Sequence, residues 1–394
     1  MAIRNRHGEM HILMTNTSLS NRTGSELYLK DVAQELRRRG HQVSLYSPKL
    51  GPLAEDLRRE GLSVYGNLAD LDQTPDIIHG QHHLETMTAL SRFPHTPVVH
   101  FCHGAIPWEE IPPTHPRILH YVAVSTFLQR QLVDRYHVSA PRTHLIPNFV
   151  DLSRFRPRAP LPPFPEKALA FSNQISNSNI ARLIRSACWQ QGIRLTVLGK
   201  ANRTPSDAPE KILPSYEIVF ARGRSALEAL ACGVAVICCD VEGMGPIVTT
   251  GNFERLYQAN FGLSILQTPV STGSLIEELR KYNPHDATDV FKLAREVLDM
   301  RHAVDSILDV YNLAREDWRQ HSIQDHDSES ASMFHYLDFL SRSLRRPPRA
   351  WPAISQVIAK WFSRNRVRLR FPLDLLAYVR CRLHRRFVFN RPEI

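Results

Sequence analysis

One stretch of the chain, Val219–Gly233, reads VFARGRSALEALACG and has the residue types of an anion-binding site. A short apolar strand is predicted to end before Arg222, Gly223 turns the chain, and a helix begins near Ser225. Free amide N–H groups at a helix N-terminus attract negative charge. Arg222 and Arg224 add two guanidinium groups, which bind phosphate well, so this turn is the strongest candidate site.

Glu228 lies one turn into the same predicted helix, at the end that we expect to be exposed. A carboxylate there can accept hydrogen bonds from the two hydroxyls of a ribose. The segment therefore has the parts needed to hold a nucleoside diphosphate. The alternative is an ordinary surface glutamate with no ligand.

Histidines gather at the ends of predicted strands, at His79, His82, His83, His100 and His103. A neutral imidazole both donates and accepts hydrogen bonds near pH 7, so a histidine facing a ligand can bind a sugar hydroxyl or assist proton transfer. The spacing of these five residues matches no metal-ligand set. Most of the chain's other histidines are expected to be structural or solvent-facing.

Glycines mark two further loops. Gly24 precedes a predicted helix, where backbone N–H groups can approach an anion; the alternative is a plain turn with Ser25 as N-cap. The loop Val241–Thr249 carries Gly243 and Gly245, which would let backbone amides reach a ligand. A simple turn between strand and helix is the competing interpretation of this loop.

These residues are positioned by an alternation of apolar strands and amphipathic helices. Met10–Asn16 predicts a buried strand, Ser25–Arg39 a helix ended by Gly40, and Gln42–Tyr46 the next strand. The same alternation continues to about residue 148 and predicts a parallel sheet with helices on both faces. A second alternating series begins at residue 168.

A proline-rich segment, FRPRAPLPPFPEK, separates the two series, and proline excludes both a helix and a central strand there. We therefore predict two Rossmann-like domains that face a central cleft, where ligands of open α/β sheets bind. The predicted divisions are a first domain (1–155), a linker (156–167), a second domain (168–319), a polar spacer (320–340) that is flexible over Gln320–Glu329, and a basic, helical tail (341–394).

The formal charge of +10 is concentrated in the tail. Residues 341–394 hold fourteen Lys or Arg against two acids, a formal +12, which leaves −2 for residues 1–340. Two pieces of this tail, Ala353–Phe362 and Leu373–Phe389, mix apolar residues with arginines. That composition suits the surface of an anionic membrane, and the alternative is a helix packed on the enzyme with its arginines in solvent.

The apolar segments and the cysteines of the sequence indicate in which cellular compartment the protein is expected. No window reaches the roughly 20 apolar residues of a membrane-spanning helix, and the first residues lack the apolar stretch of a signal peptide. The six cysteines show no CxxC spacing and are expected to be buried thiols. We therefore expect a cytoplasmic protein, peripheral on the inner face of the membrane if the tail binds lipid.

Three segments resemble the GT-B glycosyltransferases, and among them the large family 4. NRTGSELYLKDVAQELRRRGHQVSLYS resembles the family's opening glycine loop and first helix. IPNFVDLSRFRP resembles its signature at the end of the first domain, with Phe149 in place of a glycine. RSALEALACGVAVI resembles its donor-binding helix and the strand that follows. The resemblance runs over most of residues 9–318 and does not cover the tail.

The resemblance implies roles for particular residues. His103 matches a histidine that faces the transferred sugar and is our catalytic candidate, while His82 and His83 are candidates for contacting the acceptor. Glu228 matches the second glutamate of the family's pair. From the resemblance and the chemistry of the residues together, the candidate donor-binding residues are Thr23, Gly24, Arg222, Gly223, Arg224, Ser225, Glu228, Gly243, Met244 and Gly245.

Two features of the family's pattern are missing. Phe220 stands where the family has its first glutamate, and ALAFSNQISNSN lacks the Arg–Lys pair that usually follows the first strand of the second domain. Arg222 and Arg224 are positioned to substitute for that pair, since a guanidinium binds phosphate in a bidentate manner.

We therefore expect a glycosyltransferase that moves a sugar from a nucleotide-sugar to a glycan or lipid-linked acceptor, with no metal and no other cofactor, and, by the resemblance, with retention of configuration. A capsule, exopolysaccharide or lipopolysaccharide precursor is the acceptor that the resemblance implies. The alternatives are a nucleotide-sugar 2-epimerase of the same fold and a catalytically silent nucleotide- or carbohydrate-binding protein. No nucleic-acid partner is expected, because the sequence contains no recognised nucleic-acid module.

Overall fold

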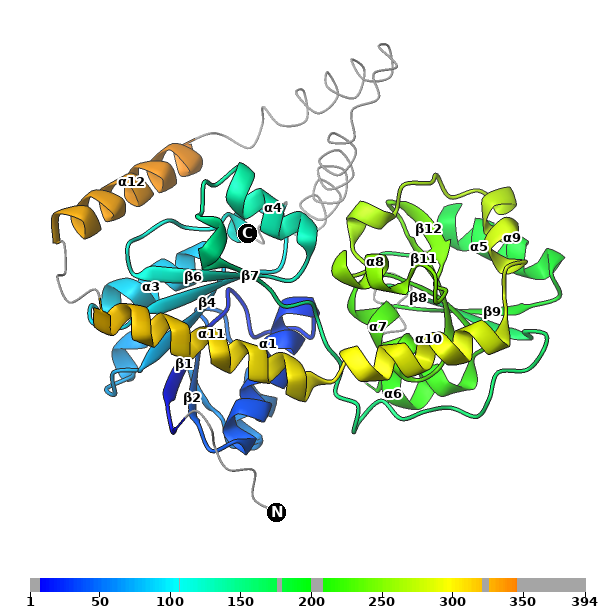
Figure 1. The fold of residues 1–394 in the computed structure, drawn as a ribbon, viewed down its shortest axis with the longest axis horizontal. Helices are drawn as coiled ribbons and strands as arrows, with labels where there is room; N and C mark the ends of the chain where they lie inside the picture. The colour runs from blue at the N-terminus through cyan, green and yellow to red at the C-terminus, as the bar shows by residue number, and fades with distance from the viewer. Residues whose placement is uncertain (1–7, 106, 176–178, 200–207, 321–325, 346–394) are drawn as a thin grey trace, which may run out of the picture.

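The computed structural model describes residues 8–345, apart from 106, 176–178, 200–207 and 321–325, and builds them around two β-sheets (Figure 1). The first sheet contains seven parallel strands among the described residues, in the order β3-β2-β1-β4-β5-β6-β7. They are β1 (His11–Thr15), β2 (Gln42–Tyr46), β3 (Ser63–Tyr65), β4 (Ile77–Gln81), β5 (Val98–Cys102), β6 (Ile118–Ala123) and β7 (Thr143–Leu145).

Helices cover both faces of this sheet, and β1, β4 and β5 are accordingly buried on both sides. On one face lie α1 (Gly24–Arg38), α2 (Pro52–Arg59) and α11 (Met300–Gln320), and on the other lie α3 (His83–Arg92) and α4 (Thr126–Asp134). The short 3-10 turns of this half are η1 (Leu68–Asp70), η2 (Trp108–Glu110) and η3 (Ala140–Arg142). The strand order reverses between β1 and β4, and such a reversal opens a crevice beyond the strand ends.

The second sheet has the order β12-β11-β10-β8-β9, with β12 antiparallel at its edge. Its strands are β8 (Lys167–Phe171), β9 (Arg194–Leu198), β10 (Ile218–Ala221), β11 (Ala235–Asp240) and β12 (Gly243–Ile247). One face is covered by α7 (Arg224–Ala231), α8 (Phe253–Gln258) and α10 (Pro284–Val297), and the other by α5 (Asn179–Gln190) and α9 (Thr272–Leu279). The remaining elements are α6 (Pro209–Ile212), η5 (Leu213–Ser215) and η6 (Leu263–Ile265).

The chain passes between the two sheets twice, at neighbouring points. The outgoing segment contains no helix or strand over residues 156–166. Where the chain returns, the N–H of Val150 donates to the carbonyl of Leu298 (2.8 Å) and the N–H of Met300 donates to the carbonyl of Val150 (3.1 Å). The predicted pair of Rossmann-like α/β sheets is confirmed.

The position of α11 differs from the sequence-based expectation, which assigned residues 168–319 to the second domain. The helix packs on the first sheet beside α1. Its apolar stripe of Val304, Ile307 and Tyr311 is fully buried there, at spacings that place the three side chains on one helix face. The last helix that covers the first sheet thus comes after the whole second sheet in the sequence.

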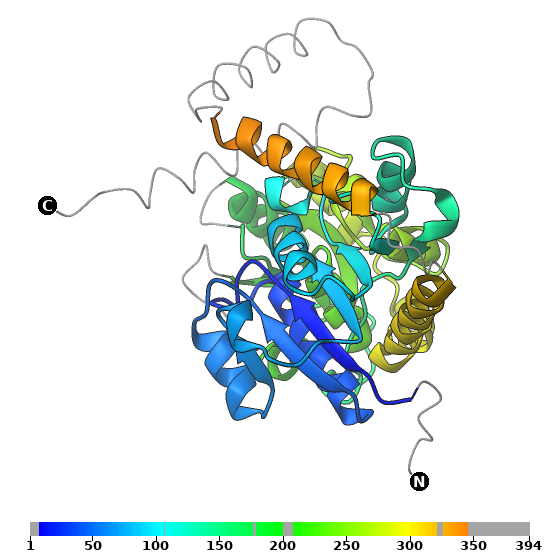
Figure 2. The ribbon, with the colours of Figure 1, turned by 90° about the vertical axis from the view of Figure 1, so that its left-hand side faces the viewer.

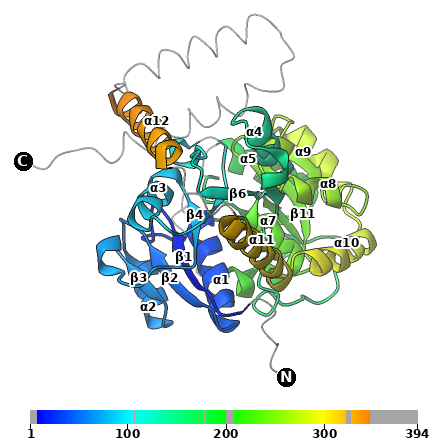
Figure 3. The ribbon, with the colours of Figure 1, turned by 60° about the vertical axis from the view of Figure 1, so that its left-hand side comes forward.

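The expected polar spacer over residues 320–340, flexible over Gln320–Glu329, is also corrected. A twenty-residue helix, α12 (His326–Arg345), occupies most of it. Figures 2 and 3 show this helix beside α3, along the outside of the first sheet. Of the predicted basic tail, residues 346–394 lie outside the described residues. No helix in the described part of the chain is long and apolar enough to cross a membrane.

Candidate active site

The two sheets meet where α1 lies against the start of α7. The guanidinium of Arg224 at the start of α7 donates through Nη2 to Oδ2 of Asp31 on α1 (2.5 Å). This contact brings the anion-binding turn predicted in the second domain next to the glycine-led helix predicted in the first. The two predicted donor-binding regions therefore lie at one interface.

The N-terminus of α7 has the geometry of an open anion site. Gly223 adopts φ 54° and ψ −134°, which glycine reaches without strain, and its N–H donates to the carbonyl of Phe261 (2.7 Å). The next two N–H groups, of Arg224 and Ser225, have no recorded acceptor among the described residues. Two backbone donors and the helix dipole are thus available for a phosphate.

The sequence alone identified no partner for the Arg224 side chain. In the structure it is shared between two carboxylates. Besides Asp31, it binds Glu228, with 2.8 Å between Nε and Oε1. All three side chains are at least 85% buried, and Glu228 is not the exposed residue that we predicted. Burial raises the pKa of the Glu228 carboxyl, and Arg224 opposes that shift. Burial disfavours the charged guanidinium, but Asp31 and Glu228 outweigh it and raise the pKa of Arg224.

Arg222 is paired in the same way on the other side of the turn. Its Nε donates to Oδ2 of Asp240 (2.5 Å) and lies 3.7 Å from Oε2 of Glu242. Asp240 also accepts from Ser172 Oγ (2.7 Å), at the end of β8. Each arginine of the predicted anion-binding turn therefore stands between two acids. Phe220 is fully buried in β10.

The glycine loop of the first sheet leads into α1 as predicted, with Thr23 as N-cap and Gly24 as the first helical residue. A Cβ added at Gly24 would meet no atom within 4 Å, so the space beside this residue is open. One turn on, Tyr28 is buried against Phe149, the residue in place of the family's glycine (5.1 Å between ring centroids). Its hydroxyl has no hydrogen-bond partner among the described residues.

His103, the catalytic candidate, follows β5 and packs edge-on against the Tyr28 ring, with 4.4 Å between centroids. Its Nε2 is buried and, within the described chain, has no hydrogen-bond partner. Burial lowers the pKa of His103 to about 4, although Glu110 opposes the shift, so the imidazole is neutral at pH 7. A neutral imidazole beside a hydroxyl suits hydrogen bonding to a sugar better than charge stabilisation.

His82 follows β4 and connects it to the loop that follows β1. It has φ 61°, an uncommon value for a residue with a side chain. Its Nδ1 accepts from the N–H of Thr17 (3.2 Å), and its Nε2 lies 3.6 Å from Oε1 of Glu110. Burial lowers the pKa of His82, but the hydrogen bond and charge of Glu110 more than offset this and raise it overall. Strained backbone supported on two sides is typical of functional sites.

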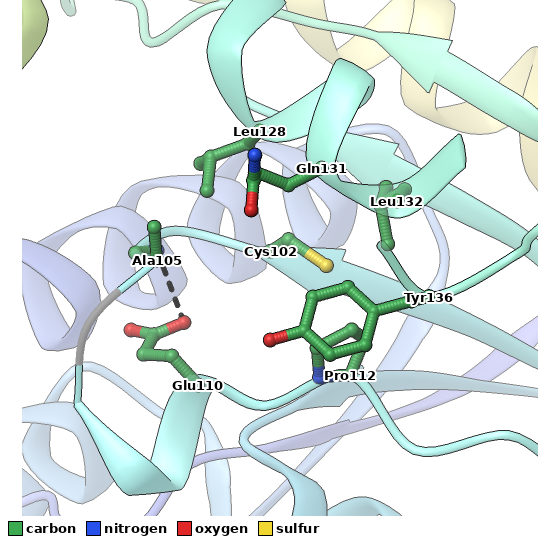
Figure 4. Close-up of a pocket in the computed structure, with 9 residues that line it drawn as sticks. Cys102, Ala105, Glu110, Pro112, Leu128, Gln131, Leu132 and Tyr136 are labelled. Carbon is green, nitrogen blue, oxygen red and sulfur yellow. Dashed lines mark hydrogen bonds between the residues drawn. The ribbon is translucent and has the colours of Figure 1, made fainter. Parts of the chain in front are cut away.

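Glu110 belongs to η2 and holds the loop after β5 in place. Its Oε2 accepts from the N–H groups of His103 (3.2 Å) and Gly104 (3.1 Å). Burial raises the pKa of this carboxyl, and its contacts with His82 and His103 lower it by more. Beside Glu110 is a cavity of about 10 Å³, lined also by Cys102 and Tyr136 and large enough for one water (Figure 4).

His83 is placed differently from His82. It is the first residue of α3, and its Nδ1 lies 2.8 Å from the hydroxyl of Tyr336 on α12. Burial lowers the pKa of His83 to about 4. His79 and His100 are buried within the sheet, where His79 bonds the Tyr311 hydroxyl (2.5 Å) and His100 bonds Thr86 (3.2 Å). The five histidines thus separate into a site pair, a helix contact and two core residues.

The predicted glycine loop after β11 is corrected to a strand. Gly243, Met244 and Gly245 form the start of β12. The N–H of Met244 donates to the carbonyl of Thr268 (2.8 Å) and is therefore already paired. A Cβ on Gly245 would lie 2.8 Å from the carbonyl oxygen of Ile265. These glycines allow two backbone segments to approach closely. A hollow of about 280 Å³ follows this edge.

Sequence reasoning missed four acids of the site: Asp31, Asp240 and Glu242, which pair with the two arginines, and Glu110, which contacts His82 and His103. Only Asp31 had a signal, since it is an acid among the apolar positions Leu29, Val32 and Ala33 of a helix expected to be buried on that side. Within the described residues, no group of three or more His, Cys, Asp or Glu side chains could hold a metal ion.

The sequence and the fold both match known proteins. A family model described as Glycosyltransferase Family 4 matches residues 22–154, which include α1, His82, His103 and Glu110. No curated protein gives a significant sequence match to the chain. The family match therefore covers the first half of the chain from α1 to β7 and leaves out β1, and the second sheet is compared through solved structures.

Two solved structures show the same two-sheet architecture. A glycosyltransferase from Rickettsia africae ESF-5 superposes with a TM-score of 0.58 at 13% identity, over 78% of this chain and 98% of that one. Anabaena Alr3699/HepE, solved with UDP and glucose, superposes with a TM-score of 0.54 at 16% identity, over 77% and 99%. At such identities the likeness establishes the fold. The chain therefore has the two-sheet GT-B fold, and its likeness to Glycosyltransferase Family 4 lies in residues 22–154.

Proposed function

We propose that the protein transfers a sugar from a nucleoside-diphosphate-sugar to a hydroxyl of a glycan or lipid-linked acceptor. The observation that carries the proposal is the start of α7, where two unpartnered N–H groups and two arginines lie beside the buried Glu228. The structures of HepE with UDP and with UDP-glucose support the donor class. The donor would span the interface between α7 and α1.

Donor binding, in this proposal, exchanges one partner of Arg224. The diphosphate takes the place of Asp31 on the guanidinium, because phosphate forms the same bidentate, charge-assisted bonds as a carboxylate. Glu228 then accepts from the ribose hydroxyls, as the family resemblance implies. The Arg224 N–H and the Ser225 N–H complete the phosphate site.

In the proposed reaction the bond between the anomeric carbon and the diphosphate oxygen breaks, and a bond from that carbon to the acceptor oxygen forms. The acceptor's proton passes to the departing diphosphate. Arg222, Arg224 and the helix N-terminus stabilise the departing charge without a metal, a contribution that is commonly the largest in such reactions. Retention of configuration is part of the proposal by resemblance to family 4.

Calorimetric titration with UDP, GDP, ADP and TDP tests the donor site. At least one should bind, and Asp31→Asn should bind it about tenfold more tightly, because the competing carboxylate is gone. Asp305→Asn is a matched control, since this acid also pairs with an arginine, Arg39, at the α1–α11 contact. Unchanged or weaker binding by Asp31→Asn would show that Asp31 does not compete with the diphosphate.

Incubation with the bound nucleotide-sugar alone separates the alternatives. Slow release of free sugar indicates a transferase that uses water as acceptor, whereas an epimerised donor indicates a 2-epimerase. Binding with neither product would favour a catalytically silent protein.

A further inference from the structure

The helix α12 is held on the protein body by its inner face. Met333 and Tyr336 pack against the core beside α3. The Tyr336 hydroxyl bonds His83, and Phe339 stacks near Trp108 with 6.4 Å between ring centroids. Nε of Arg117 donates to Oε2 of Glu329 (3.0 Å) at the start of the helix. The orientation of α12 on the first sheet is thereby fixed.

The outer face of α12 is apolar and uncovered. Phe334, Leu337 and Leu344 are 66%, 56% and 76% exposed. Their spacing of three and seven residues places all three on one side of a helix with 3.6 residues per turn. Of the eight exposed large apolar side chains in the described chain, three therefore form one stripe.

The charges around this stripe do not oppose an anionic surface. Asp338 is the acid next to it, and Asp338 accepts from Nε of Arg342 one turn further on (2.8 Å). Beyond the helix, residues 346–394 contain twelve Lys or Arg and two acids, and their aromatic residues include Trp351, Trp361 and Phe362. Arginines interleaved with Trp and Phe are the composition of segments that bind the interface of anionic membranes.

We propose that Phe334, Leu337 and Leu344 on the outer face of α12 insert into the headgroup region of an anionic lipid membrane. The arginine-rich chain that follows supplies the electrostatic attraction. A membrane fits better than a protein partner, because the stripe is narrow and runs directly into a long basic segment with almost no acids.

The inner face of the same helix contacts His83. His83 is next in sequence to His82, at the end of β4 that leads to the candidate acceptor side, called here the mouth of the first sheet. A protein bound to a membrane through α12 would present this mouth close to the lipid headgroups. This consequence rests on the proposed transfer to a lipid-linked acceptor, whereas membrane binding itself does not.

Vesicle flotation tests the proposal with the full-length chain and without any activity assay. The parent protein should float with vesicles of equimolar phosphatidylcholine and phosphatidylglycerol and not with phosphatidylcholine alone. The triple variant Phe334→Gln, Leu337→Gln, Leu344→Gln should bind the anionic vesicles about tenfold more weakly at unchanged net charge.

The matched control replaces three exposed apolar residues elsewhere, Phe164→Gln, Trp189→Gln and Leu293→Gln. This variant should float as the parent does. Equal flotation of the α12 variant and the parent would overturn the proposal, as would a parent that binds neither vesicle. A lower melting temperature of the α12 variant with unchanged flotation would also overturn it, since the stripe would then be covered by the chain itself.

Discussion

The two halves of the site differ in how they use charge. At the start of α7, Arg222 and Arg224 are surrounded by four carboxylates, from Asp31, Glu228, Asp240 and Glu242. At the ends of β4 and β5, neutral His103 and the hydroxyl of Tyr28 lie beside a single pair, His82 and Glu110.

This difference matches what each half would bind. A diphosphate carries two negative charges and can displace a carboxylate from a guanidinium. The ion pairs with the acids would therefore hold the two arginines in position until the donor binds. A sugar is uncharged and is held by neutral donors and acceptors. We therefore expect substitutions at the start of α7 to lower stability and nucleotide binding. Substitutions at the ends of β4 and β5 should slow the reaction instead.

The largest effect is expected from Arg224→Ala. The substitution leaves Asp31 and Glu228 buried without their cation, which should lower the free energy of unfolding by about 3–5 kcal/mol. Urea unfolding followed by circular dichroism measures the loss. Nucleoside diphosphate binding should also disappear.

Arg194→Ala is the control for Arg224→Ala, because Arg194 and its partner Glu166 are both 74% exposed. That pair should contribute less than about 1 kcal/mol. Similar losses for the two variants would break the comparison, since the buried network would then be no stronger than a surface pair.

The next effect is kinetic. His103→Gln removes the imidazole beside Tyr28 and should slow donor hydrolysis about 100-fold with unchanged affinity for the nucleotide. Tyr28→Phe deletes only an unpartnered hydroxyl and should slow it less. His302→Gln, on α11, is the control. If His103→Gln also lost affinity for the nucleotide, His103 would instead contact the donor phosphates.

The smallest effect is a pH dependence of stability from His82. Its pKa is raised in the folded protein, so its contribution is fully present below the unfolded value of about 6.5 and is lost as the pH rises through the folded value. The free energy of unfolding should therefore fall as the pH rises from about 6.5 through the folded value. Glu110→Gln should flatten this slope, and an equal slope in the variant would assign it to other groups.

Much of the fold follows from local pattern. Gln42–Tyr46 is a strand with the predicted bounds, because its apolar residues lie between clear turn signals. The helix α3 was not predicted, since its N-cap, His82, makes no capping hydrogen bond and joins strand to helix without a turn residue. β12 was taken for a loop because its glycines, which here serve close packing, resemble turn residues.

The site was predicted as far as it depends on neighbours in sequence. Gly24 and Ser225 lie at helix N-termini because a glycine before an amphipathic run marks such an end. The pairing of Arg224 with Asp31 joins residues 193 positions apart, and no local pattern encodes it. The residue roles stay predictions until substrates are measured.

The return of α11 to the first sheet affects how the protein can be made. The buried residues of α11, among them Val304, Ile307 and Tyr311, complete a core whose remaining residues belong to the first half of the chain. During synthesis the first sheet must therefore wait, with one apolar wall uncovered, until the whole second sheet has been added. The second sheet begins and ends within one continuous segment and can fold as soon as it emerges.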